Sequence, residues 1–116
     1  MELLPKEIKE TLPALYSQEE VKDPMVCVKF FDPIGSWTWF VLEGSPVDED
    51  GYYDTDKEKV DFLFFGYVVG HEGELGYFRL KDLQTAKKNV TGITAMPIER
   101  DLYFTPCKLS KVKEEY

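Results

Sequence analysis

The sequence is poor in the residues from which metal and redox sites are built. Its 116 residues include one histidine and two cysteines, too few for a disulfide framework or for the converging ligands of a zinc site. Cys27 lies in the apolar stretch Met25–Phe31, where a small buried side chain is favoured over a reactive thiol. There is also no GxSxG, no cysteine with a histidine nearby in sequence, and no phosphate-binding glycine loop. The sequence therefore predicts neither a metal ion nor a cofactor.

Long hydrophobic runs are missing as well. No stretch approaches the roughly 20 apolar residues of a membrane span. The first residues, MELLPKEIKETL, mix apolar with charged side chains and lack the apolar centre of a signal peptide. Hydrophobic residues still make up 43 % of the chain, which is enough for the core of one domain. We expect a cytoplasmic protein with a single domain over residues 1–116 and no membrane contact.

Basic residues are outnumbered, 14 lysines and arginines against 22 acids, and the net charge is −8. Residues 43–61 hold eight of the acids and two lysines. Such a surface repels phosphate backbones, which argues against direct nucleic-acid binding. A calcium loop is also disfavoured, because Lys59 and Phe65 occupy the positions of its glycine and closing glutamate.

Two interpretations of this acidic segment remain. It is a flexible solvated loop over about residues 44–61, or it is a contact surface for a basic or nucleic-acid-binding protein. The acids assigned to that contact are Asp48, Glu49, Asp50, Asp54 and Asp56. An inhibitor that mimics the charge of DNA is a special case of the second interpretation.

Strand-like segments predominate along the chain. They are Met25–Phe31, Trp37–Leu42, Phe62–Val69, Leu75–Leu80 and Asp101–Thr105. Short helices are expected at Pro5–Leu12 and Lys81–Lys88, and the lysine-rich tail over about residues 108–116 is expected to fray. Because the strands cluster and the helices are marginal, the predicted fold class is α+β, with a mainly antiparallel sheet of four to five strands.

The single histidine begins the stretch HEGELGYF, between two strand patterns. Gly70 and Gly73 flank His71 and Glu72, which is typical of a hairpin connection. A metal or proton-transfer role for His71 would need further ligands or partners that the local sequence does not supply. A hairpin turn is the leading interpretation, with proton transfer, metal binding and partner contact as alternatives.

The stretch PIERDLYF places Glu99, Arg100 and Asp101 before an apolar segment. An arginine between two acids can form a salt bridge that pins a loop to a sheet. Alternatively, Arg100 binds an anionic ligand while Glu99 or Asp101 acts as general base, joined by Glu74 if the two loops lie on one side of the sheet. That alternative would make the protein a small hydrolase-like enzyme.

Two tryptophans share one predicted strand face. Trp37, Trp39 and Val41 alternate with Thr38, Phe40 and Leu42. Tryptophans in this arrangement fill a core, or they anchor a partner protein if the face is exposed. Stacking on single-stranded bases would need a basic groove, which the net charge opposes.

Several ordered blocks resemble a known family. The blocks KFFDP, SWTWF, FFGYVVG, ELGYF and PIERDLYF are similar to small bacterial proteins classed as domain of unknown function 2958, over about Leu4–Leu109. The resemblance implies a compact cytosolic domain, often found among plasmid, phage and other mobile-element genes. Similar proteins often carry an apolar or aromatic residue in place of His71, which counts against a catalytic histidine.

These observations favour one hypothesis about function. It is a non-enzymatic accessory or regulatory module of a mobile element that acts by binding another protein. The proposed contact residues are the five acids above with Trp37 and Trp39. The sequence leaves open the oligomeric state and the identity of the partner.

Overall fold

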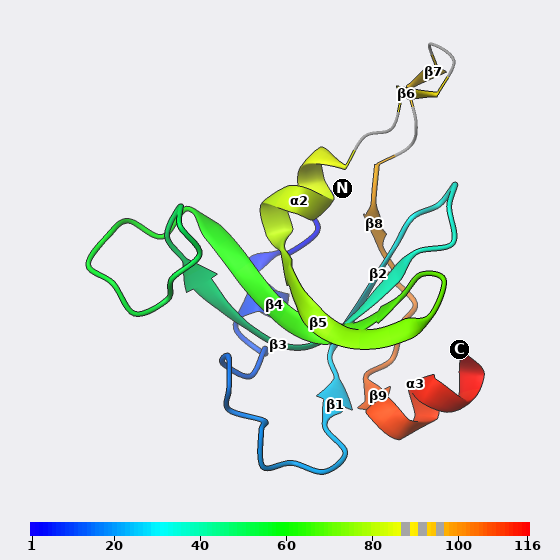
Figure 1. Ribbon diagram of the computed structural model, residues 1–116, viewed down its shortest axis with the longest axis horizontal. Helices are drawn as coiled ribbons and strands as arrows, with labels where there is room; N and C mark the ends of the chain where they lie inside the picture. The colour runs from blue at the N-terminus through cyan, green and yellow to red at the C-terminus, as the bar shows by residue number, and fades with distance from the viewer. Residues whose placement is uncertain (87–88, 91–92, 95–96) are drawn as a thin grey trace.

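The centre of the molecule is one antiparallel sheet with the strand order β5-β4-β3-β2-β8 (Figure 1). The structure is a computed structural model of the chain and describes residues 1–86, 89–90, 93–94 and 97–116. The strands of the sheet are β2 (Val28–Phe31), β3 (Thr38–Val47), β4 (Asp61–Val69), β5 (Gly73–Arg79) and β8 (Glu99–Arg100). The predicted α+β class with a mainly antiparallel sheet is confirmed.

Smaller elements surround this sheet. Two short strand pairs are β1 (Met25–Val26) with β9 (Cys107–Lys108), and β6 (Asn89–Val90) with β7 (Ile93–Thr94). The helices are α1 (Lys6–Lys9), α2 (Leu80–Thr85) and α3 (Leu109–Glu115). Both predicted helices are present but shorter than expected, and Lys87 and Lys88 lie outside the described residues. None of the helices in the described ranges is long and apolar enough to cross a membrane.

Two hydrophobic cores form, one on each face of the sheet. The first contains Phe30, Val41 and Phe64, and it is covered by the N-terminal segment and α2. The second contains Phe40 and Leu42, and it is covered by α3. Neighbouring residues of a strand point to opposite faces, so Phe40 and Val41 belong to different cores, as the alternation in Trp37–Leu42 predicts. Burial on both faces explains why β4 is almost entirely apolar after Asp61.

β3 extends well beyond its predicted end at Leu42. A bulge shifts the register between Val41 and Glu43, and residues 44–47 then pair with Asp61–Phe64. Glycine, serine and proline have low strand propensity, but pairing with a long neighbouring strand overrides that local preference here. The acidic connection between β3 and β4 is therefore shorter than predicted and covers residues 48–60.

Three predictions about strand and tail boundaries are wrong. The stretch Met25–Phe31 is split between β1 and β2, which belong to different sheets. Asp101–Thr105 is not a strand, because the chain turns where the Asp101 carboxylate accepts the N–H of Tyr103 at 2.9 Å. The C-terminal tail is the helix α3, with Leu109 and Val112 buried. Two hydrogen bonds from Ser110 to the Asp23 carboxylate, at 2.9 and 2.7 Å, fix the start of α3.

Candidate functional site

The structure does not bring the predicted carboxylate cluster together. Glu74 lies on β5 and Glu99 on β8, at opposite edges of the sheet. The Arg100 guanidinium donates hydrogen bonds to the carbonyls of Glu2, at 2.8 Å, and Leu3, at 3.2 Å. Arg100 therefore pins a segment to the sheet as predicted, but through backbone carbonyls of the N-terminus rather than through Glu99 or Asp101.

Asp101 belongs to a contact that holds the C-terminus. Its carboxylate lies 3.4 Å from Lys29 Nζ, which also donates to the Tyr116 hydroxyl at 3.1 Å. Burial alone would lower the pKa of Lys29, but the hydrogen bonds and charges of Tyr116 and Asp101 outweigh it and raise that pKa. The ammonium also lies over the rings of Phe40 and Tyr116. The contacts of Asp101 are thus structural. Asp101, one of the two proposed general bases, does not lie beside Glu74.

His71 lies in the predicted hairpin, between β4 and β5. Val69 pairs with Gly73, and the Gly70 N–H donates to the Glu72 carbonyl at 3.0 Å. The rings of His71 and Trp37 are close to perpendicular, with an interplanar angle of 74° and 6.3 Å between the ring centroids. In the described part of the chain, no three His, Cys, Asp or Glu side chains converge as metal ligands.

The two predicted tryptophans lie together, but their environments differ. Their ring centroids are 6.4 Å apart, and Trp39 packs against the first core. Trp37 is exposed and covers Gly70, where an added Cβ would lie 2.6 Å from the indole ring. Trp39 is thus a core residue, and Trp37 is the one that faces solvent.

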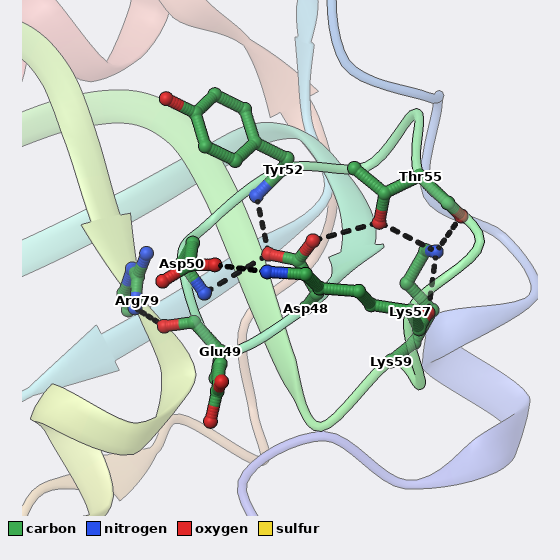
Figure 2. Close-up of polar contacts among 8 residues, drawn as sticks. All are labelled: Asp48, Glu49, Asp50, Tyr52, Thr55, Lys57, Lys59 and Arg79. Carbon is green, nitrogen blue, oxygen red and sulfur yellow. Dashed lines mark hydrogen bonds and ion pairs between the residues drawn. The ribbon is translucent and has the colours of Figure 1, made fainter.

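Asp48 organises the acidic connection between β3 and β4 (Figure 2). Only 1 % of the residue is exposed. One carboxylate oxygen accepts the N–H groups of Asp50 and Tyr52, at 2.9 and 3.0 Å, and the other accepts the Thr55 hydroxyl at 2.7 Å. The Thr55 hydroxyl and these backbone groups hold the pKa of Asp48 below its usual value. Asp48 therefore supports the loop from within, and almost none of its surface is exposed.

Other acids of the segment are also engaged inside the protein. Glu43 is buried, and the Asp61 side chain is buried beside Arg79 with 3.9 Å between the charged atoms. Asp50 is exposed and forms an ion pair with Lys57 at 2.7 Å. Glu49, Asp54 and Asp56 are exposed. The acidic surface is therefore smaller than the count of eight acids suggests.

We expect Asp48→Asn to make the free energy of unfolding less dependent on pH at acidic pH. The folded-state pKa of Asp48 is depressed, so its contribution is fully present above the unfolded-state pKa of about 3.9. It is lost as the pH falls through the folded-state value, because the unfolded state binds the proton first. Urea unfolding at a series of pH values between about 6 and 2 checks this. Asp54→Asn, a change at an exposed acid of the same loop, should leave the curve parallel to the wild type, and parallel curves for both variants would contradict the assignment.

A second buried carboxylate builds a site that the sequence analysis missed. Glu43 follows the bulge in β3, and its two carboxylate oxygens accept the N–H groups of Tyr16 and Gln18, each at 2.8 Å. These bonds hold the segment before β1 against the sheet. Tyr16 has a φ of 69°, a conformation that costs free energy for a non-glycine residue. The strained backbone points the Tyr16 side chain toward neighbouring aromatic rings.

The aromatic rings form a continuous row across the sheet. Glu43 pairs with Phe65, which pairs with Tyr77 of the edge strand. The Tyr16 ring centroid lies 6.4 Å from that of Tyr77 and 5.9 Å from that of Tyr53. Partial burial and a side-chain hydrogen bond with Tyr16 raise the pKa of Tyr77. The Tyr77 hydroxyl is therefore protonated at neutral pH, and Tyr77 presents a neutral aromatic surface.

A groove of about 350 Å³ follows this row. We call it the tyrosine groove; its walls include Tyr16, Glu43, Phe65, Leu75, Tyr77 and Leu109. Glu19, Lys22 and Lys113 contribute charged side chains to its lining. A lining that combines apolar and aromatic side chains with a few charged ones suits binding of a side chain or a short segment of chain. The sequence signal that points to it is the alternation of Leu75 and Tyr77 with Glu74 and Gly76.

The comparisons with known proteins agree with the resemblance seen in the sequence. No curated protein and no solved structure matches the chain significantly. The family described as "Protein of unknown function (DUF2958)" matches residues 3–114. This match covers nearly the whole chain, including both cores, the acidic connection and the tyrosine groove. The chain therefore belongs to the DUF2958 family.

Proposed function

We propose that the chain is a non-enzymatic protein-binding module whose partner docks in the tyrosine groove. The observation that carries this proposal is the exposure of Leu75 and Tyr77, 49 % and 54 %, beside a Tyr16 held in a strained conformation. Aromatic anchors surrounded by a polar rim supply much of the binding energy in protein complexes. The groove is preformed by hydrogen bonds to Glu43, so a partner would not have to order it on binding.

The partner has basic character. The chain carries a net charge of −8, and Tyr53 connects the groove to the acidic connection through its ring contact with Tyr16. Exposed Glu49, Asp54 and Asp56 lie in that connection. Electrostatic attraction of this kind accelerates association and weakens as salt is added. Together with the mobile-element setting implied by the family resemblance, this supports an accessory or regulatory role in the bacterial cytoplasm.

The dispersal of the carboxylate cluster supports binding over hydrolysis. Arg100 and Asp101 are engaged with the two chain termini, and Glu74 lies at the opposite edge of the sheet. A general base and an anion-binding arginine must meet around one substrate to act together. The exposed groove offers aromatic contact area instead.

The test compares two tyrosines in one capture experiment. Tagged wild type, Tyr77→Ser and Tyr103→Ser are incubated with a bacterial lysate at low and moderate salt, and the captured proteins are quantified by mass spectrometry. Tyr103 is 95 % exposed and lies outside the groove, so its variant controls for loss of a surface tyrosine. A hot-spot aromatic contributes about 2 kcal/mol or more, so Tyr77→Ser should reduce capture at least tenfold.

Two outcomes would contradict the proposal. Equal capture by both variants would show that the groove does not bind the partner, and capture that rises with salt would show that the partner is not attracted by charge. A DNA-mimic inhibitor is a special case, in which the partner binds nucleic acid and duplex DNA competes with the chain. If duplex DNA does not compete, the DNA-mimic hypothesis is excluded and the docking proposal is unaffected.

A further inference from the structure

The two edges of the central sheet are built differently. The edge strand β8 has two residues, and Arg100 ties it to the N-terminal segment. The other edge, β5, has seven residues, and its register with β4 is uninterrupted from Gly73 to Arg79. Among the strands of the described ranges, β4 alone is bonded to β5. In Figure 1, β5 is the outer strand of the sheet, and α2 leaves from its end.

An open edge of this length can accept another strand. Alternate N–H and C=O groups of β5 point away from β4 and are available to a new neighbour. Natural edges are commonly blocked by proline, lysine or a bulge. The sequence of β5, GELGYFR, contains no proline or lysine, and its pairing has no bulge.

The two faces of β5 would select different side chains. Leu75 and Tyr77 point into the tyrosine groove. On the opposite face, Glu74 lies beside Trp37 and Glu72 in a hollow of about 290 Å³. A side chain that pairs with Glu74 there would meet two carboxylates and an indole ring, an environment that suits a lysine or arginine.

Gly76 lies at the middle of this edge. A Cβ built on it meets no atom within 4 Å, so the space above it is open. A glycine in a strand often marks a place where another chain approaches closely. Large side chains from a neighbouring strand cover such glycines in stable sheets.

We propose that an extended segment of the basic partner adds to β5 as a further strand of the sheet. Its apolar residues lie beside Leu75 and Tyr77, and its lysines or arginines alternate with them and lie beside Glu74. This inference rests on the proposed function and specifies the partner's binding mode. A second copy of the chain is a poorer occupant, because each copy carries a net charge of −8.

Synthetic peptides test this mode without altering the protein. The first is a fluorescent peptide of about eight residues with alternating valine and lysine, long enough to pair with β5. The second is a pair of peptides with the same sequence and with every other backbone nitrogen methylated. One member of the pair is blocked along one hydrogen-bonding edge, and the other member along the opposite edge. The third has glutamate in place of lysine. We expect the first to bind, at least one methylated version to bind at least tenfold more weakly, and the glutamate peptide not to bind.

Two protein-side measurements complete the test. Binding of the first peptide should slow hydrogen exchange at alternate amides of Gly73–Arg79. Glu74→Lys should weaken binding of the lysine-containing peptide at least tenfold. Glu115→Lys, the same change at an exposed acid of α3, should leave binding of that peptide unchanged.

The outcomes separate this inference from the docking proposal. Equal binding of the unmethylated and both methylated peptides would overturn strand addition and leave groove docking standing. Failure of all peptides, with Tyr77-dependent capture of a natural partner, would also overturn strand addition alone. Concentration-dependent dimers with protected β5 amides would show that a second copy occupies the edge.

Discussion

Replacing Glu43 with alanine is expected to destabilise the protein by about 3 kcal/mol, because hydrogen bonds to a charged acceptor contribute about 1.5–3 kcal/mol each. The carboxylate is buried and accepts two N–H groups, from Tyr16 and Gln18. Alanine leaves both donors without their acceptor and releases a segment that includes buried Leu15. Urea unfolding gives the change in free energy, and hydrogen exchange at Tyr16 and Gln18 shows whether the segment has been released.

Two controls make this result specific. Glu43→Gln retains the shape of the side chain and one oxygen, so about half of the effect is expected, since the amide nitrogen cannot accept an N–H. Glu19→Ala removes an exposed acid of the groove lining and should change stability by less than about 0.5 kcal/mol. A similarly small effect for Glu43→Ala would show that the carboxylate does not hold the segment. The Glu43 variants should lose both stability and Tyr77-dependent binding. Glu19→Ala should not show this joint loss.

Local patterns were sufficient to predict the central part of the fold. β4 is a long run of apolar and aromatic residues, and its predicted start is within one residue of the observed Asp61. The glycines around His71 predicted the hairpin to β5, because turn residues between two strand patterns act over a few positions. These elements are determined by neighbouring residues, so a sequence alone reveals them.

Other elements depend on residues far apart in the chain. α3 has two buried apolar side chains, and its first turn is fixed by Asp23, 87 positions before Ser110. The tyrosine groove depends on Glu43, which binds backbone groups 25 and 27 positions away. Counting charges also treats all acids alike, although Asp48 and Asp61 have buried carboxylates. No local pattern distinguishes such an acid from an exposed one, so the candidate site could not be predicted in full.

The cross-strand pair Gly66 and Gly76 should respond in opposite ways to the same substitution. A Cβ on Gly66 would lie 2.0 Å from the carbonyl oxygen of Phe40, a backbone atom that cannot move without disturbing β3. Gly66→Ala should therefore cost about 3 kcal/mol, at the upper end of what overpacking usually costs. Gly76→Ala meets no neighbour and should stabilise by up to about 1 kcal/mol, because alanine has less conformational freedom in the unfolded chain.

Urea unfolding of the two variants measures this difference directly. The close approach at Gly66 occurs where Val41 pairs with it, just before the bulge that places Glu43 on the groove side. A large effect at Gly66 would therefore support the register that builds the tyrosine groove. Equal effects at the two glycines would contradict that register, because only Gly66 lies against the backbone of β3. A stable Gly76→Ala variant would further show that β5 does not need this glycine for folding. The open position would then be free for a side chain from another strand.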